Sequence, residues 1–197
     1  MLPNSTPQAT REKVIDSLLN SGLWTNRKIT KMCVVGVRGY YLNTMGKRGV
    51  NDRGIYDDAF FVLSPDTFTS FNGNTDPSRY KARVATLVAP QTIKYKKGLH
   101  GYSRKAGPYP AFRQASDVIV KRDGGSGNGR QLLDGTFTDR GTRRFWTNNH
   151  KGGYTVTSSA GCLTVPPNQW NAYYSLVCLQ MQRFQQRIFK MNLLENK

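Results

Sequence analysis

The spacing of turn residues between Lys31 and about Val165 most constrains what this chain can fold into. Within that span, apolar or alternating stretches are short and are separated by Gly, Asn, Asp and Pro. This punctuation is typical of strands joined by turns, so we expect a β-rich body. The stretches expected to form strands include Met32–Val37, Ala59–Leu63, Ala82–Val88, Thr92–Tyr95 and Val118–Lys121.

Helical patterns lie at the two ends of the chain. Residues from about Thr10 to Leu19 predict a short helix that Thr10 caps and Gly22 ends. A second helix is expected after Pro166-Pro167, because proline suits the first turn. Apolar residues then recur at three- and four-residue spacing: Trp170, Tyr173, Tyr174, Val177, Met181, Phe184, Ile188 and Met191. We expect this stripe to pack onto the sheet; attachment of a basic amphipathic helix to a membrane is the alternative.

These patterns divide one domain into three parts. At 197 residues, the chain is long enough for one sizeable core. We predict an α+β fold with a sandwich- or barrel-like β body: residues 1–30 form an N-terminal helical extension, 31–165 the β-rich body and 166–197 a C-terminal helix. The longest apolar runs, such as Ala59–Leu63, are too short to cross a bilayer, so no transmembrane segment is expected.

The chain is strongly basic. It carries 29 Lys and Arg against 12 Asp and Glu, a formal charge of +17. Such an excess favours an anionic partner: nucleic acid, anionic lipid or a bacterial envelope polymer. No helix-turn-helix, RRM or zinc-finger pattern is present, so we expect no obligate nucleic acid. Three cysteines and two histidines offer neither a disulfide framework nor a structural zinc pattern. We predict no metal or cofactor, and Cys33 and Cys178 as packing residues.

One pair of residues suggests catalysis. His150 precedes Cys162 by twelve positions, and Cys162 follows the small residues Ser159-Ala160-Gly161. A thiol needs a base to become a nucleophile at neutral pH, and a histidine can supply it. We expect a strand that ends at His150 and a turn at Gly152-Gly153 that makes a short hairpin, which brings the base to the thiol. Gly161 permits close approach of the backbone, so amides there can face a reacting carbonyl. A structural histidine beside a buried thiol is the alternative.

These residues resemble a known family. His150 followed by Ser159-Ala160-Gly161-Cys162 is similar to the motif of the YkuD-type L,D-transpeptidase fold, in particular its compact variants among phage and prophage proteins. Those variants carry a His-x-Gly-Gly hairpin, a Ser-x-x-Gly-Cys turn and a Pro-Pro-x-x-Trp helix start, here Pro166 to Trp170. The resemblance covers roughly Val34 to Leu179 and is sharpest from His150 to Trp170.

The resemblance implies acyl transfer on peptidoglycan stem peptides. Cys162 would attack the carbonyl of a diaminoacid-to-D-alanine bond, and His150 would take the thiol proton and return it to the leaving amine. The backbone amides of Gly161 and Cys162 would hold the oxyanion, with Ala160 a further contributor. Water would release the acyl group in a carboxypeptidase or endopeptidase, whereas an amine acceptor would make a cross-link.

The chain departs from the family pattern at two positions. The family usually has histidine directly before Gly-Cys and arginine two residues after the cysteine, where this chain has Ala160 and Thr164. That arginine helps to seat the substrate carboxylate. Arg143, Arg144 or Lys151 therefore replaces it here, or the substrate differs. Ser159 and Ala160 are also expected to line the substrate site.

Two further sets of residues are weaker candidates. His100, in Gly98-Leu99-His100-Gly101, is an alternative base that can line the cleft. Asp52, Asp57 and Asp58 form an acidic patch. Paired acids can serve a glycosidase, but we expect these to be charged turn residues beside Gly54.

The N-terminus lacks the basic start and apolar stretch of a secretory signal. We expect synthesis in the cytoplasm and action at the bacterial cell wall, after release through a membrane lesion made by another protein, as for a phage lysis enzyme. The alternative function is a basic nucleic-acid-binding or virion structural protein that has the fold without the activity, since its tyrosines and arginines can stack on bases.

Overall fold

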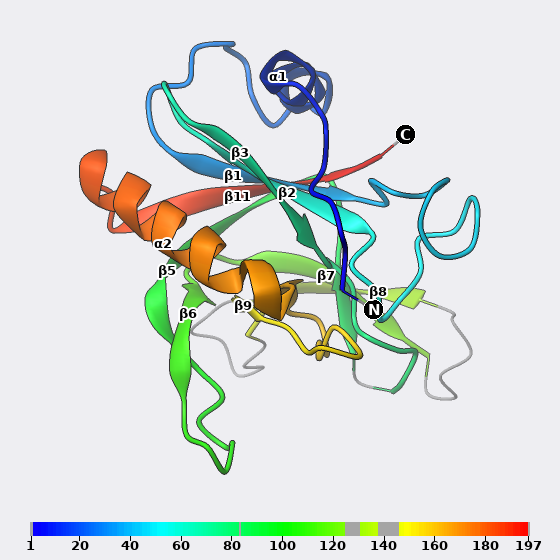
Figure 1. The fold of residues 1–197 in the computed structure, drawn as a ribbon. Helices are drawn as coiled ribbons and strands as arrows, with labels where there is room; N and C mark the ends of the chain where they lie inside the picture. The colour runs from blue at the N-terminus through cyan, green and yellow to red at the C-terminus, as the bar shows by residue number, and fades with distance from the viewer. Residues whose placement is uncertain (1, 83, 125–130, 138–145, 197) are drawn as a thin grey trace.

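Eight strands form one curved sheet that makes up most of the molecule (Figure 1). The computed structural model describes residues 2–82, 84–124, 131–137 and 146–196. Along the sheet the order is β10-β9-β6-β5-β11-β1-β2-β3. In chain order, these strands are β1 (Cys33–Arg38), β2 (Asp58–Leu63), β3 (Phe68–Gly73), β5 (Gln91–His100), β6 (Tyr109–Gln114), β9 (Asn149–Lys151), β10 (Leu163–Val165) and β11 (Ile188–Glu195).

A backbone bridge joins the two edges of this sheet. Asn74, just after β3, donates its N–H to the carbonyl of Thr164 in β10 at 2.8 Å, and the Thr164 N–H returns to the Asn74 carbonyl at 2.9 Å. The sheet is thereby nearly closed, as predicted for a barrel-like β body. Closure satisfies the backbone groups that an open edge would leave unpaired.

A second, three-stranded sheet contributes to the core. Its order is β4 (Ala85–Leu87), β7 (Val118–Asp123) and β8 (Gln131–Phe137). Ala85, Leu87, Val118 and Val120 are buried in the larger of the two apolar clusters. The strands expected at Met32–Val37, Ala59–Leu63, Ala82–Val88, Thr92–Tyr95 and Val118–Lys121 are all confirmed, with shifted bounds.

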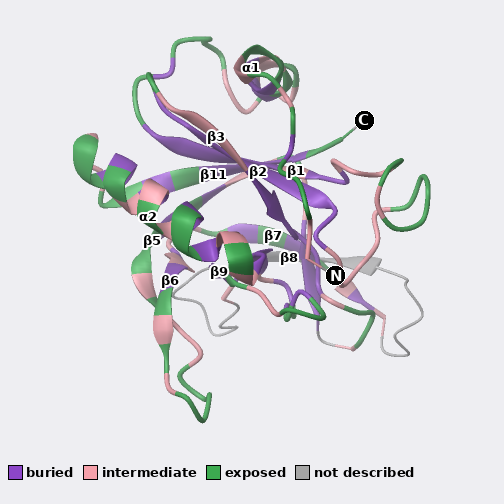
Figure 2. Cartoon of the chain, viewed as in Figure 1, coloured by how far each residue is buried: buried purple, intermediate pink, exposed green. Residues whose placement is uncertain are grey.

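Two helices cover opposite faces of the central strands (Figure 1). Helix α1 (Arg11–Asn20) begins at Thr10, whose hydroxyl accepts the Lys13 N–H at 3.3 Å, as predicted. Its apolar residues pack with Cys33, Val35 and Phe61 on one face. Helix α2 (Pro167–Arg183) packs Trp170, Tyr173, Val177 and Met181 against the other face, so this part of the predicted stripe belongs to the core. The central strands are buried on both sides as a result (Figure 2).

The predicted helix over 166–197 is wrong after Arg183. Helix α2 ends at Arg183, and Ile188–Glu195 is strand β11, which lies between β5 and β1. Phe189, Met191 and Leu193 point into the core, as every second residue of a strand does. Ile188 and Met191 are also three residues apart, a spacing that fits a helix, so the sequence is compatible with both. As a strand, this segment forms backbone hydrogen bonds with β1, to which it runs parallel, and with β5, to which it runs antiparallel. These two pairings stabilise the extended form more than an exposed extension of helix α2 would.

Among the described residues, no helix has both the length and the apolar character needed to cross a membrane.

Candidate active site

Two adjacent strands position the predicted base and thiol. Strands β9 and β10 pair in parallel, with Asn149 opposite Leu163 and His150 opposite Thr164. Cys162 therefore lies immediately before β10, one position before the residue that pairs with Asn149. The expected hairpin is wrong, because hairpin strands run antiparallel. Instead, residues 152–162 leave the sheet at the end of β9 and return to the level at which β9 begins, so that β10 runs in the same direction. Gly152 is needed at this exit, because a Cβ there would clash with the hydroxyl of Tyr56.

The structure brings His150 together with His100 and Cys162. One nitrogen of each histidine and the sulfur of Cys162 lie within 4.8 Å of one another. His100 ends β5, and its ring stacks on that of His150 with centroids 3.8 Å apart and planes inclined by 12°. The weaker candidate, His100, thus lies at the same site as the predicted pair.

Hydrogen bonds fix the tautomer of His150. Its Nδ1 lies 2.8 Å from the carbonyl oxygen of Lys151 and 3.0 Å from the hydroxyl of Tyr109. The carbonyl only accepts, so Nδ1 must carry the hydrogen. Tyr109 in turn donates to the Lys151 carbonyl at 3.1 Å. Nε2 of His150 is then left with a lone pair, which is what a general base for Cys162 requires.

Burial keeps both members of the pair uncharged. It lowers the pKa of His150 to about 3, an effect to which His100 adds and which the Lys151 carbonyl opposes. Burial also raises the pKa of the Cys162 thiol to about 11, and a hydrogen bond with the backbone of Asn148 offsets part of that rise. The pair therefore rests as neutral thiol and neutral imidazole, not as a preformed ion pair.

The residues before Cys162 form a tightly bonded turn. The Ser159 hydroxyl accepts the Gly161 N–H at 3.0 Å and donates to the Cys162 carbonyl at 2.7 Å. The Ala160 carbonyl accepts the Ala85 N–H at 3.2 Å. Gly161 has φ of +139°, a conformation that favours glycine. The Gly161 N–H already donates to the Ser159 hydroxyl, so an oxyanion can accept this N–H only by displacing that hydroxyl.

Among the described residues, the same three side chains form the group that can hold a metal ion. Two imidazoles and a thiolate are suitable zinc ligands. The nearly parallel stack of His100 on His150 nevertheless directs their in-plane lone pairs side by side rather than toward one point. One ring would have to turn before both could hold one ion.

Of the residues predicted to bind the substrate carboxylate, the structure describes Lys151. Lys151 is exposed at the end of β9, with its Nζ 5.7 Å from the centre of the Tyr109 ring. Thr164, where the family pattern has arginine, is fully buried and closes the barrel through its backbone. Arg143 and Arg144 lie outside the described residues.

The acidic patch is structural. Asp57 and Asp58 were expected to be charged turn residues, but both are buried and Asp58 begins strand β2. Asp58 accepts the N–H of Gly39 and of Thr75, both at 2.6 Å, and Asp57 accepts the Asp52 N–H at 2.8 Å. Burial, and then the neighbouring carboxylates, raise the pKa of Asp57 and of Asp58. Because these carboxylate oxygens accept backbone N–H groups, they hold in place the loops at the end of β1.

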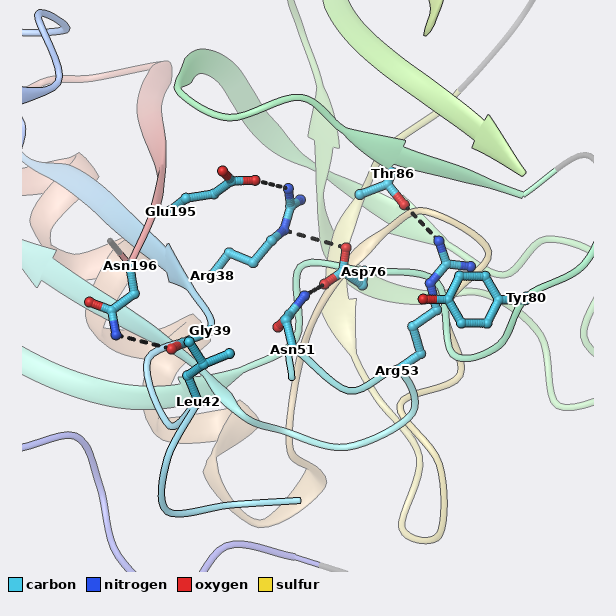
Figure 3. Close-up of a pocket in the computed structure, with 10 residues that line it drawn as sticks. All are labelled: Arg38, Gly39, Leu42, Asn51, Arg53, Asp76, Tyr80, Thr86, Glu195 and Asn196. Atoms are coloured by element: carbon cyan, nitrogen blue, oxygen red, sulfur yellow. Dashed lines mark hydrogen bonds and ion pairs between the residues drawn. The ribbon is translucent and has the colours of Figure 1, made fainter. Parts of the chain in front are cut away.

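Ion pairs also fill the pocket beside these loops (Figure 3). Arg38 lies between Asp76 and Glu195, 3.4 Å from each. Arg53 lies over the ring of Tyr80 at 3.8 Å and binds both oxygens of Asp123, at 2.6 and 2.9 Å. Both guanidinium groups are thus already engaged by the protein, and the pocket shows no spare cation for a ligand.

The sequence did not point to Tyr109 and Asn148, which complete the site. Tyr109 orients His150, and the side-chain amide of Asn148 donates to Nδ1 of His100 at 3.0 Å. Asn148 stands two residues before His150, which is the only sequence signal for it. Tyr109 comes from β6, and only the pairing of β6 with β9 and β5 brings it near.

Comparison with known proteins gives no match: no family model fits the chain, and no curated protein or solved structure is significantly similar to it. The site must therefore be interpreted from its own chemistry.

Proposed function

We propose that the protein is a cysteine-dependent enzyme that cleaves peptide bonds in peptidoglycan stems, as a phage lysis enzyme of the YkuD-type fold would. The observation that carries the proposal is the arrangement of His150. Its Nδ1 hydrogen is donated to the Lys151 carbonyl, which leaves Nε2 with a lone pair, and one nitrogen of the ring lies within 4.8 Å of the Cys162 sulfur. The motif from His150 to Trp170 supplies the substrate class.

The reaction proceeds by acyl transfer. His150 takes the thiol proton as Sγ of Cys162 attacks the carbonyl carbon, so no free thiolate accumulates. The tetrahedral intermediate collapses, the C–N bond breaks, and His150 returns the proton to the leaving amine. Water then attacks the thioester, with His150 again as base, and releases the acyl group and the thiol. An amine in place of water gives a cross-link.

Defined stem peptides test this function. Wild type, Cys162→Ala and Cys178→Ala are incubated with a synthetic tetrapeptide stem and with purified peptidoglycan, and the products are identified by mass spectrometry. Cys178 is a matched control because it is a half-buried thiol on α2. We expect cleavage by wild type and Cys178→Ala only. Identical product profiles from all three proteins would remove Cys162 from the mechanism, and no cleavage by wild type, with salt-sensitive DNA binding instead, would favour the binding protein.

A further inference from the structure

A basic pocket lies on the outer face of the sheet, away from the cysteine. Its volume is about 480 Å³, and it lies where the starts of β1 and β11 meet β5. Four cations line it and no carboxylate does: Lys31, Lys94, Arg187 and Lys190. Lys94 is six residues from His100 along β5, which corresponds to about 20 Å of strand. The pocket is therefore separate from the candidate active site.

Two of these lysines lie next to each other on adjacent strands of the sheet. Lys190 of β11 is the direct register partner of Lys94 of β5, so both side chains leave the sheet on the same face. Like charges placed directly opposite each other repel, and no described acidic side chain forms an ion pair with either one. An anion bound between them removes this repulsion.

The wall of the pocket is built rigidly. The side chain of Gln186 donates to the Met32 carbonyl at 3.0 Å and accepts the Met32 N–H at 2.9 Å, which fastens the start of β11 to that of β1. Its neighbour Gln185 has φ of +51°, the left-handed conformation that ends helix α2, and the Gln186 N–H closes the helix end by donating to the Met181 carbonyl at 2.7 Å. A site fixed in this way loses little further freedom when a ligand binds.

An aromatic side chain completes the lining. Trp24, from the segment after α1, is half-buried and lines the same pocket. An indole offers an apolar face against which the C–H groups of a sugar ring can lie, while lysine and arginine bind phosphate oxygens. From this combination we infer that the pocket binds a phosphate-bearing carbohydrate. This inference does not depend on catalysis by Cys162.

Binding of glucose 6-phosphate to the Cys162→Ala protein tests the inference. Calorimetry and the change in tryptophan fluorescence compare three proteins: the parent, a pocket variant with Lys94→Thr and Lys190→Thr, and a control with Lys97→Thr and Lys121→Thr. The control removes the same charge from two exposed strand lysines outside the pocket. We expect the pocket variant to weaken binding about tenfold or more and the control less than twofold.

Two comparisons make the test decisive. We expect the ligand to raise the melting temperature of the parent and control but not of the pocket variant, which stays folded because it loses a repulsive pair. Inorganic phosphate should bind more weakly than the sugar phosphate, since it does not reach Trp24. Equal weakening in both double variants would overturn the inference, because general attraction to a basic protein would then explain the binding. Phosphate binding as tight as that of the sugar phosphate would overturn the carbohydrate assignment.

Discussion

At the scale of single residues, the proposed chemistry depends on how burial sets the charge of Cys162 and His150. Many reactive cysteines are preformed thiolates with a lowered pKa. Here burial raises the thiol pKa to about 11 and lowers the imidazole pKa to about 3. His150 is thus a free base at every pH above about 3, and in the proposed reaction the thiol gives up its proton only during attack.

The pH dependence of alkylation tests this neutral pair. We expect the rate of Cys162 modification by iodoacetamide to rise steadily up to at least pH 9, because the thiolate fraction keeps growing below a pKa of about 11. The rate is measured by mass spectrometry of the peptide that contains Cys162. A rate that levels off near pH 6 would show a stabilised thiolate and contradict the account.

In the proposed reaction, Tyr109 is a positioning residue, since its hydroxyl is hydrogen-bonded to His150. Tyr109→Phe removes one neutral hydrogen bond to Nδ1 of His150 and one to the Lys151 carbonyl. We expect kcat to fall roughly fivefold with KM unchanged, the effect of about 1 kcal/mol. The tautomer of His150 is followed by ¹⁵N NMR, in which Nδ1 should lose part of its proton occupancy.

Tyr102→Phe provides the control, because Tyr102 is an exposed tyrosine on the same β5–β6 hairpin. A fall in kcat of the same size in both variants would mean that the hairpin, not the contact with His150, is responsible.

At the scale of elements, β11 decides the architecture. Met191 is fully buried, whereas Ile188 is 44% exposed to solvent. We expect Met191→Ala to lower the free energy of unfolding by about 2–5 kcal/mol and Ile188→Ala by less than about 1 kcal/mol. Urea unfolding measures both. In a helix these residues would share one buried face, so equal losses would contradict the strand.

Local patterns predicted some elements and missed others for a physical reason. The Thr10 cap, the start of α2 after Pro166 and the apolar strands could be found because their signals are local. Strand β11 was missed since its apolar residues fit both periods, and only its two neighbouring strands favour the extended form. The parallel pairing of β9 and β10 depends on closure of the barrel, which no short segment encodes.

The candidate site shows the same division. Cys162 and His150 could be proposed from sequence because their residue types are rare in this chain. The contribution of His100 and Tyr109 could not, because it requires β5, β6 and β9 to lie side by side. Asp57 and Asp58 were misjudged because a turn-like sequence does not reveal whether the turn is covered by other segments.

At the scale of the whole molecule, buried titrating groups tie stability to pH. The pKa of Asp57 and of Asp58 is raised in the folded protein, so the fold binds protons that the unfolded chain has released. Their contribution to stability is fully present below about pH 4 and is lost as the pH rises through the raised pKa values. His150 acts oppositely: its lowered pKa contributes stability above about pH 6.5 that is lost as the pH falls toward 3.

Urea unfolding between pH 5 and pH 8 measures the acidic contribution. We expect Asp57→Asn to make the loss of stability toward pH 8 smaller than in wild type, since the buried proton no longer has to leave. Asp117→Asn, an exposed carboxylate, should leave the pH dependence unchanged. A wild-type profile that does not differ from that of Asp57→Asn would show that this carboxyl does not titrate abnormally.

The central claim is that Cys162 forms a covalent bond to the substrate, and the mass of the enzyme during turnover tests it most directly. Wild type is mixed with a stem tetrapeptide, quenched in acid and examined as intact protein and as peptides. We predict an added mass equal to the acyl portion of the substrate, located on Cys162 and released by hydroxylamine, with no adduct and no turnover in Cys162→Ala. Turnover by Cys162→Ala at the wild-type rate would contradict the account.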